Sequence, residues 1–180
     1  MIRKSLLASA VLLLAAGCSD GGTPARVATA VSVTPGSLQL DAVGATRMVR
    51  AVVNDQDGKP MTGAAVTWAS SAGSVTVASA GGDSAIVTGA GNGSATITAT
   101  AGGASGTATV QVAQVATSIA AAGGDAQTGA VATALPNQLQ VVVRDRLNAP
   151  VPGITISFTV QGGGTVTAPS AVTGANGVAS

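Results

Sequence analysis

Two groups of side chains in this sequence have the types and spacing to do chemistry. The chain has one cysteine, Cys18, which could be acylated or oxidised, and its seven acidic residues are all aspartates, of which Asp55 and Asp57 lie close together. It has no histidine. A Ser-His-Asp triad, a Cys-His pair and an imidazole-bound zinc or copper ion are therefore excluded.

The aspartates near residue 55 have the spacing with which a calcium loop begins, because Asn54, Asp55 and Asp57 precede Gly58. An EF-hand loop also needs a bidentate glutamate at its end, and the chain has no glutamate. Asp55 and Lys59 could form an acid–base pair, but the tip of a hairpin offers no dry cleft in which a pKa would shift. We interpret the segment as a solvated hairpin corner, and we predict no metal, no cofactor and no catalytic residue.

Three other ligand classes find little support. The glycine-rich segments Gly89–Gly93 and Gly162–Gly164 are not followed by Lys-Ser/Thr or by a helical pattern, so they are interpreted as turns rather than phosphate loops. Sugar rings are usually bound by exposed aromatic faces, and the only aromatic residues are Trp68 and Phe158, which we expect to be buried. The formal net charge is +1 with scattered basic residues, which gives no footprint for nucleic acid.

The elements that must position these residues begin with an export signal. Arg3 and Lys4 precede an apolar run from Ser5 to Gly17. A membrane-spanning helix needs about 20 apolar residues, so this shorter run predicts a cleaved signal peptide over residues 1–17.

The end of this run identifies the kind of signal. Leu14-Ala15-Ala16-Gly17-Cys18 resembles a bacterial lipobox, which implies that the Cys18 thiol is alkylated with diacylglycerol and becomes the first residue of the mature chain. An ordinary signal peptide with a chance cysteine is the alternative, but the only cysteine falls at the end of the run. Ser19, in place of aspartate, resembles the Gram-negative pattern for transfer to the outer membrane. Attachment would depend on the lipid chains, because the mature chain has six basic and seven acidic residues.

Short β-strands follow a tether. Residues 18–26 are the lipidated cysteine and a polar, glycine-containing segment, which favours a flexible connection. Beyond it, short runs of alternating apolar and polar residues are broken by Gly, Asn, Asp and Pro, a pattern that predicts an all-β fold.

An internal repeat divides this β-region. Val53–Gly63 recurs as Val143–Gly153 at an offset of 90 residues (143 − 53), with the leading Val, the Asp, the Pro and the final Gly identical. The match continues from Val66-Thr67-Trp68 to Ile156-Ser157-Phe158. Repeats of this length are whole domains, and we expect Trp68 and Phe158 to be equivalent core anchors.

The two copies resemble bacterial Ig-like domains. Residues 27–113 resemble the group 2 type through Val31-Ser32-Val33-Thr34-Pro35, Val66-Thr67-Trp68 and Gly93-Ser94-Ala95-Thr96-Ile97-Thr98-Ala99. Residues 114–180 resemble the group 1 type of invasin and intimin through Gly124-Asp125-Ala126-Gln127-Thr128-Gly129, Pro150-Val151-Pro152-Gly153 and Ala175-Asn176-Gly177-Val178-Ala179-Ser180. This resemblance implies two tandem antiparallel β-sandwiches, joined near Ala113–Ala116.

The second copy lacks part of the pattern. Aligning Asn92-Gly93 with Asn176-Gly177 leaves roughly two strands of the first copy without a counterpart. We therefore expect the second sandwich to be incomplete, either because the chain is a fragment of a longer protein or because this sandwich is poorly ordered alone.

Taken together, the motifs predict a lipoprotein of the cell envelope, at the outer membrane or cell surface, that acts as a structural stalk or in cell adhesion and is not an enzyme. Its expected partners are the membrane, through Cys18, and a protein or surface-glycan ligand, but not nucleic acid. Two alternatives stay open. The chain could be the non-catalytic accessory region of a longer exported enzyme, or a module that binds glycans or that binds peptides by strand addition.

Overall fold

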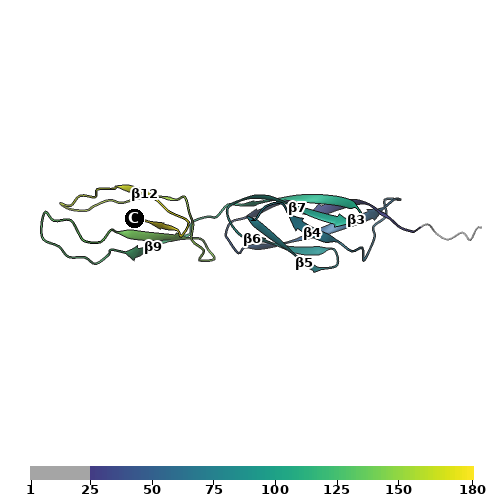
Figure 1. The fold of residues 1–180 in the computed structure, drawn as a ribbon, viewed down its shortest axis with the longest axis horizontal. Coiled ribbons are helices and arrows are strands. Elements are labelled where there is room, and N and C mark those ends of the chain that lie inside the picture. Colours follow the sequence, from purple (N-terminus) through teal and green to yellow (C-terminus); the bar gives the residue numbers. More distant parts are fainter. Residues whose placement is uncertain (1–24) are drawn as a thin grey trace, which may run out of the picture.

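The computed structural model describes residues 25–180, which form two β-modules placed end to end (Figure 1). Strands β1–β8 make module 1 and strands β9–β13 make module 2. No helix among the described residues is long and apolar enough to cross a membrane. The predicted signal peptide, Cys18 and the tether up to Pro24 lie outside the described residues.

Module 1 is a sandwich of two four-stranded sheets. One sheet is antiparallel and has the order β1-β3-β6-β5, formed by β1 (Ala28–Thr34), β3 (Thr46–Asp55), β6 (Ser84–Gly89) and β5 (Val75–Gly81). The other has the order β2-β8-β7-β4, formed by β2 (Ser37–Leu40), β8 (Ala104–Val112), β7 (Gly93–Ala101) and β4 (Thr67–Ser70). Within it β2 pairs in parallel with β8, and the other pairs are antiparallel.

The core of module 1 follows from the two-residue period of its strands. In β3, Val49, Ala51 and Val53 are buried, whereas the residues between them are exposed. Most of the buried core residues are valine or alanine, and Trp68 packs against them as a partly buried side chain. At Gly106 in β8, a Cβ atom would overlap the carbonyl group of Val31 in β1.

Module 2 has fewer and shorter strands. Its larger sheet has the order β13-β10-β9, with β9 (Ser118–Gly123), β10 (Gln140–Arg144) and β13 (Val178–Ala179), and β11 (Thr155–Ser157) pairs separately with β12 (Ser170–Val172). Its core has four buried apolar residues, against sixteen in module 1. The predicted all-β fold with an incomplete second sandwich is confirmed.

One detail of the predicted alignment is wrong. Asn176-Gly177 leads into β13, which pairs with β10 as β6 pairs with β3. Asn92-Gly93 instead leads into β7, which pairs with β4 and β8. The two Asn-Gly turns therefore occupy different places in their modules, and counterparts of β7 and β8 are absent from module 2 within residues 118–180.

Candidate functional site

The polar cluster of the first repeat forms a tight corner at the end of β3. Asp55 is only 2% exposed, and its Oδ1 accepts hydrogen bonds from the backbone N–H groups of Asp57 (3.0 Å) and Lys59 (2.8 Å). Gly58 adopts a φ of 74° and donates its N–H to the carbonyl oxygen of Asp55 at 3.0 Å. We call residues 54–60 the first corner.

The second repeat builds the same corner at the end of β10. Asp145 is 3% exposed, and its Oδ1 accepts from the N–H groups of Leu147 (2.9 Å) and Ala149 (3.0 Å). Asn148 takes the left-handed position of Gly58, with a φ of 66°. We call residues 144–150 the second corner, and it reproduces the backbone pattern of the first.

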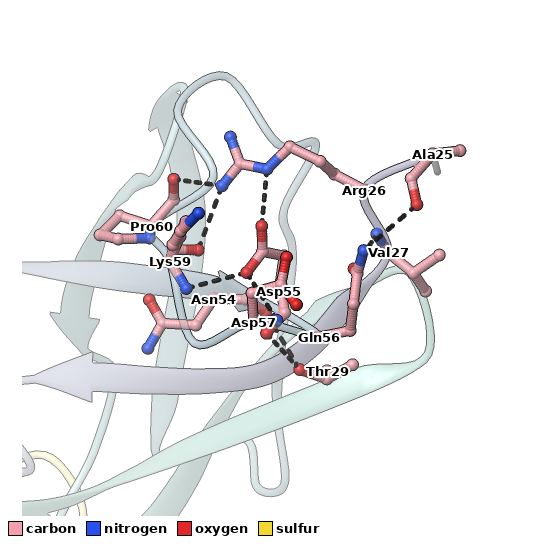
Figure 2. Close-up of polar contacts among 10 residues, drawn as sticks. All are labelled: Ala25, Arg26, Val27, Thr29, Asn54, Asp55, Gln56, Asp57, Lys59 and Pro60. Carbon is pink, nitrogen blue, oxygen red and sulfur yellow. Dashed lines mark hydrogen bonds and ion pairs between the residues drawn. The ribbon is translucent and has the colours of Figure 1, made fainter. Parts of the chain in front are cut away.

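In the first corner the other carboxylate oxygen holds the segment that enters module 1. The Arg26 Nε donates to Oδ2 of Asp55 at 2.7 Å, and its Nη2 donates to the carbonyl oxygens of Pro60 (2.7 Å) and Lys59 (3.2 Å). Figure 2 shows the guanidinium group lying over the corner with these contacts. Three hydrogen bonds thus join Arg26 to the turn.

A second side chain fixes the same incoming segment. The Gln56 side chain accepts from the N–H of Val27 at 2.8 Å and donates to the carbonyl oxygen of Ala25 at 3.5 Å. Thr29 donates its hydroxyl to the carbonyl oxygen of Asp55 at 2.7 Å. The chain is therefore held at the first corner from Ala25 onward.

In the second corner the equivalent oxygen holds the connection between the modules. The Gln114 amide donates to Oδ2 of Asp145 at 2.9 Å and to the carbonyl oxygen of Pro150 at 3.1 Å. The N–H of Val43, in the β2–β3 loop of module 1, donates to the same Oδ2 at 3.0 Å. Asp145 therefore binds both the linker and the preceding module.

Further contacts complete this intermodule joint. Arg146 makes a two-pronged ion pair with Asp41 of module 1, in which the nitrogen–oxygen distances are 2.8 and 3.0 Å. The Asp41 carbonyl oxygen accepts from the N–H of Val115 in the linker at 2.9 Å. Leu147 lies close to Gly44, because a Cβ atom added at Gly44 would be 3.7 Å from the Cδ1 atom of Leu147. The joint thus has charged, polar and apolar contacts.

These contacts decide the charge state of the corner aspartates. Burial raises the pKa of Asp55, but the Lys59 N–H, the Arg26 guanidinium and the Asp57 N–H outweigh it and hold the pKa below its usual range. Burial also raises the pKa of Asp145. Hydrogen bonds from the Gln114 amide and from three backbone N–H groups outweigh this effect and hold the pKa below its usual range. Both carboxylates are therefore ionised at neutral pH.

The predicted site residues fall into different parts of the molecule. Trp68 in β4 and Phe158 after β11 are both partly buried and pack against the cores of modules 1 and 2, respectively. The Trp68 indole N–H is buried with no hydrogen-bond partner among the described residues. Cys18 lies outside the described residues.

The calcium-like spacing serves a turn. Both carboxylate oxygens of Asp55 accept hydrogen bonds from nitrogen donors, so they face N–H groups rather than an open ligand position. Residues 25–180 contain no group of three or more His, Cys, Asp or Glu side chains placed to hold a metal ion. The sequence pattern predicted the turn, but its interpretation as a solvated corner is wrong, because Asp55 is buried and its pKa is lowered. The docking of the preceding segment on this corner was not predicted.

Comparison with known families finds one match, to a C-terminal segment of the chain. The family model of the bacterial Ig-like domain (group 1) matches residues 125–180, which confirms that prediction for this segment. The group 2 assignment of residues 27–113 stays a prediction. No curated protein matches the sequence.

Several solved structures are similar to the chain. Domains 4 and 5 of the S-layer protein SbsC are 26% identical over 49% of this chain and 54% of that one, with a TM-score of 0.42. The Yersinia pseudotuberculosis adhesin InvE is 19% identical over 82% of this chain and 48% of that one, with a TM-score of 0.41. The Escherichia coli adhesin FdeC is 20% identical over 86% of this chain and 55% of that one, with a TM-score of 0.40. The match spans about half of the first structure and about a fifth of two longer SbsC structures.

Proposed function

We propose that this chain is a lipid-anchored envelope protein whose two Ig-like modules form a stiff stalk or an adhesin-like projection. The observation that carries the proposal is the intermodule joint. Modules within one chain usually move relative to one another unless their interface is extensive. Here a buried, ionised aspartate binds both the linker and the preceding module through Oδ2, so bending would leave that charged oxygen without its donors.

The joint resists bending in more than one direction. Asp145 holds Gln114 and Val43, and the separate ion pair between Arg146 and Asp41 ties the second corner to module 1. The ion pair is partly exposed and contributes little by itself. Its value is geometric, because a two-pronged guanidinium–carboxylate contact fixes orientation as well as distance.

Anchoring is proposed from the sequence before the described residues. Diacylglycerol on Cys18 would attach the chain to a membrane, and Ser19 supports the outer membrane as its destination. Because Arg26 is docked on the first corner, only residues 19–25 separate the anchor from the module, which allows at most about 25 Å when fully extended. The stalk would therefore stand close to the membrane surface.

The same proposal covers partners and activity. The membrane is bound through Cys18, and a protein or surface-glycan ligand would bind away from the anchor. We propose neither catalysis nor nucleic-acid binding, because the sequence has no histidine and its formal net charge is +1.

The test is to produce the full chain in a Gram-negative bacterium and to analyse the membrane fraction by mass spectrometry. We expect an N-terminal peptide that begins at Cys18 and carries diacylglycerol. A Cys18→Ser variant should leave the membrane fraction, and a matched Ser19→Asp variant should stay lipidated but remain in the inner membrane. Protein with an intact Met1 in the cytosol would refute the anchoring.

Module 2 favours one alternative, a peptide-binding module. Strand β13 covers only two residues of β10, and half-buried Val141, Ile154 and Phe158 lie at the edge of the small core. An extended peptide could add a strand there. Pull-down with the full chain, compared with a version in which residues 114–180 are deleted, would separate a binder from a spacer.

A further inference from the structure

The first strand of each module is an edge strand. Strand β1 is hydrogen-bonded in its sheet only to β3, and β9 only to β10. In a stalk anchored at its N-terminus, a pull on the chain reaches these strands before any other part of their modules. An edge strand paired on one side is the element that such a pull would remove first.

The two corners lie where this removal would begin. Ala28, the first residue of β1, is paired with Asp55, and Ser118, the first residue of β9, is paired with Arg144 beside Asp145. Arg26 precedes β1, and Gln114 precedes β9. Each corner therefore binds the chain just before its first pair of residues.

The two segments use equivalent acceptors although their donors differ. The Arg26 side chain donates to the carboxylate of Asp55 and to the carbonyl oxygen of Pro60. Gln114 donates to Asp145 and Pro150, which stand 90 residues later in the sequence. Two chemically different side chains thus make the same pair of contacts in the two modules.

We propose that the two corners are mechanical locks, which hold the first edge strand of each module when the chain is pulled from its N-terminal end. The biological relevance of this inference rests on the proposed anchoring at Cys18. The resistance of the two corners to force does not depend on that anchoring. A pull on Ala25 passes through Arg26 and Asp55 into β3, a ten-residue strand that is paired on both sides. The load is thereby moved from an edge strand to the interior of the sheet.

The chemistry of the first lock suits this role. Hydrogen bonds between charged groups are about twice as strong as neutral ones, and Arg26 makes one with a carboxylate that is nearly inaccessible to solvent. Before the first pair of β1 opens, the three bonds of Arg26 and the Gln56–Val27 bond must break. A loss of this lock should therefore speed forced unfolding.

Single-molecule pulling on the unlipidated chain from Cys18 to Ser180 tests the proposal. The only thiol, Cys18, provides the attachment at the loaded end. The two modules are told apart by the length of chain that each releases. Forced unfolding is governed by the unfolding rate, and we expect Arg26→Ala to raise that rate for module 1 by about five-fold.

A matched control and a second pulling geometry separate a lock from a general stabiliser. Arg47→Ala removes another arginine of module 1, an exposed side chain that donates to the carbonyl oxygen of the adjacent Thr46, and should leave the rate unchanged. In a variant that combines Cys18→Ser with Ser37→Cys, the force is applied at position 37, so it loads β2 and bypasses β1. Arg26→Ala should then leave the forced unfolding rate of module 1 unchanged. An unchanged rate in the first geometry, or an equal increase in both, would overturn the proposal. Failure of lipidation at Cys18 would refute the anchoring and leave this result intact.

The second lock is tested in the same experiment. Gln114→Ala should raise the forced unfolding rate of module 2 and leave that of module 1 unchanged. A variant that changes neither module would contradict the equivalence of the two corners.

Discussion

A buried aspartate terminates the same strand in both modules and uses its two oxygens for different purposes. Oδ1 of Asp55 and of Asp145 closes the turn, and Oδ2 binds the segment that precedes the module. The repeated Asp and Pro made the corner visible in the sequence. The role of Oδ2 was not predictable, because its partners Arg26 and Gln114 lie 29 and 31 residues away and have different side chains.

The lowered pKa of Asp55 predicts a dependence of stability on pH. The pKa is lower in the folded state than the value of about 3.9 in an unfolded chain, so this contribution is complete above that value and is lost as pH falls through the folded pKa. We expect the free energy of unfolding of module 1 to fall below about pH 4. Urea titrations followed by the fluorescence of Trp68, the only tryptophan, would measure it.

Two variants assign this loss to one carboxylate. Asp55→Asn should be less stable at neutral pH and should lose less stability in acid than the parent. Asp83→Asn, at an exposed position, should follow the parent curve. If the free energy of unfolding of Asp55→Asn fell with decreasing pH as steeply as that of the parent, Asp55 would not be the source of the acid loss.

Gly106 sets how closely the two sheets of module 1 approach. Because a Cβ there would overlap the backbone of Val31, Gly106→Ala should destabilise module 1 by about 1–3 kcal/mol. The exposed Gly73 has no atom near its Cβ position, and Gly73→Ala should be neutral within about 0.5 kcal/mol. Urea midpoints from Trp68 fluorescence compare the two, and equal midpoints would show that the sheets can separate without cost.

At the scale of elements, the two modules differ in how well their strands are supported. Strand β3 is paired along both edges, whereas β10 has only two paired residues on the β13 side. The alternation of apolar and polar residues was enough to predict strands in both modules. The alignment of the Asn-Gly turns failed because this dipeptide suits many hairpins and does not specify which strand follows.

This difference predicts unequal local stability in the intact chain. Backbone amides of β3 and β7 should exchange with deuterium at least about ten-fold more slowly than those of β10 and β11, because module 2 has the smaller core. Hydrogen-exchange mass spectrometry on the full mature chain would measure this. Equal protection in the two modules would show that the small core of module 2 is sufficient.

At the scale of the whole molecule, the joint decides whether two sandwiches act as one rod. The internal repeat predicted two modules, but it could not predict the joint, because contacts such as Asp41 with Arg146 join residues 105 positions apart. These contacts depend on how the modules face each other. Neither the period of the strands nor the spacing of the motifs contains that information.

The stiffness of the joint is tested most directly by a distance distribution between the modules. Spin labels at Thr76→Cys and Ser157→Cys, both exposed, in a Cys18→Ser background would report it by pulsed electron resonance. We predict one narrow distribution, which should broaden when Gln114→Ala and Arg146→Ala are combined. A distribution already broad with the joint intact would contradict a stiff stalk.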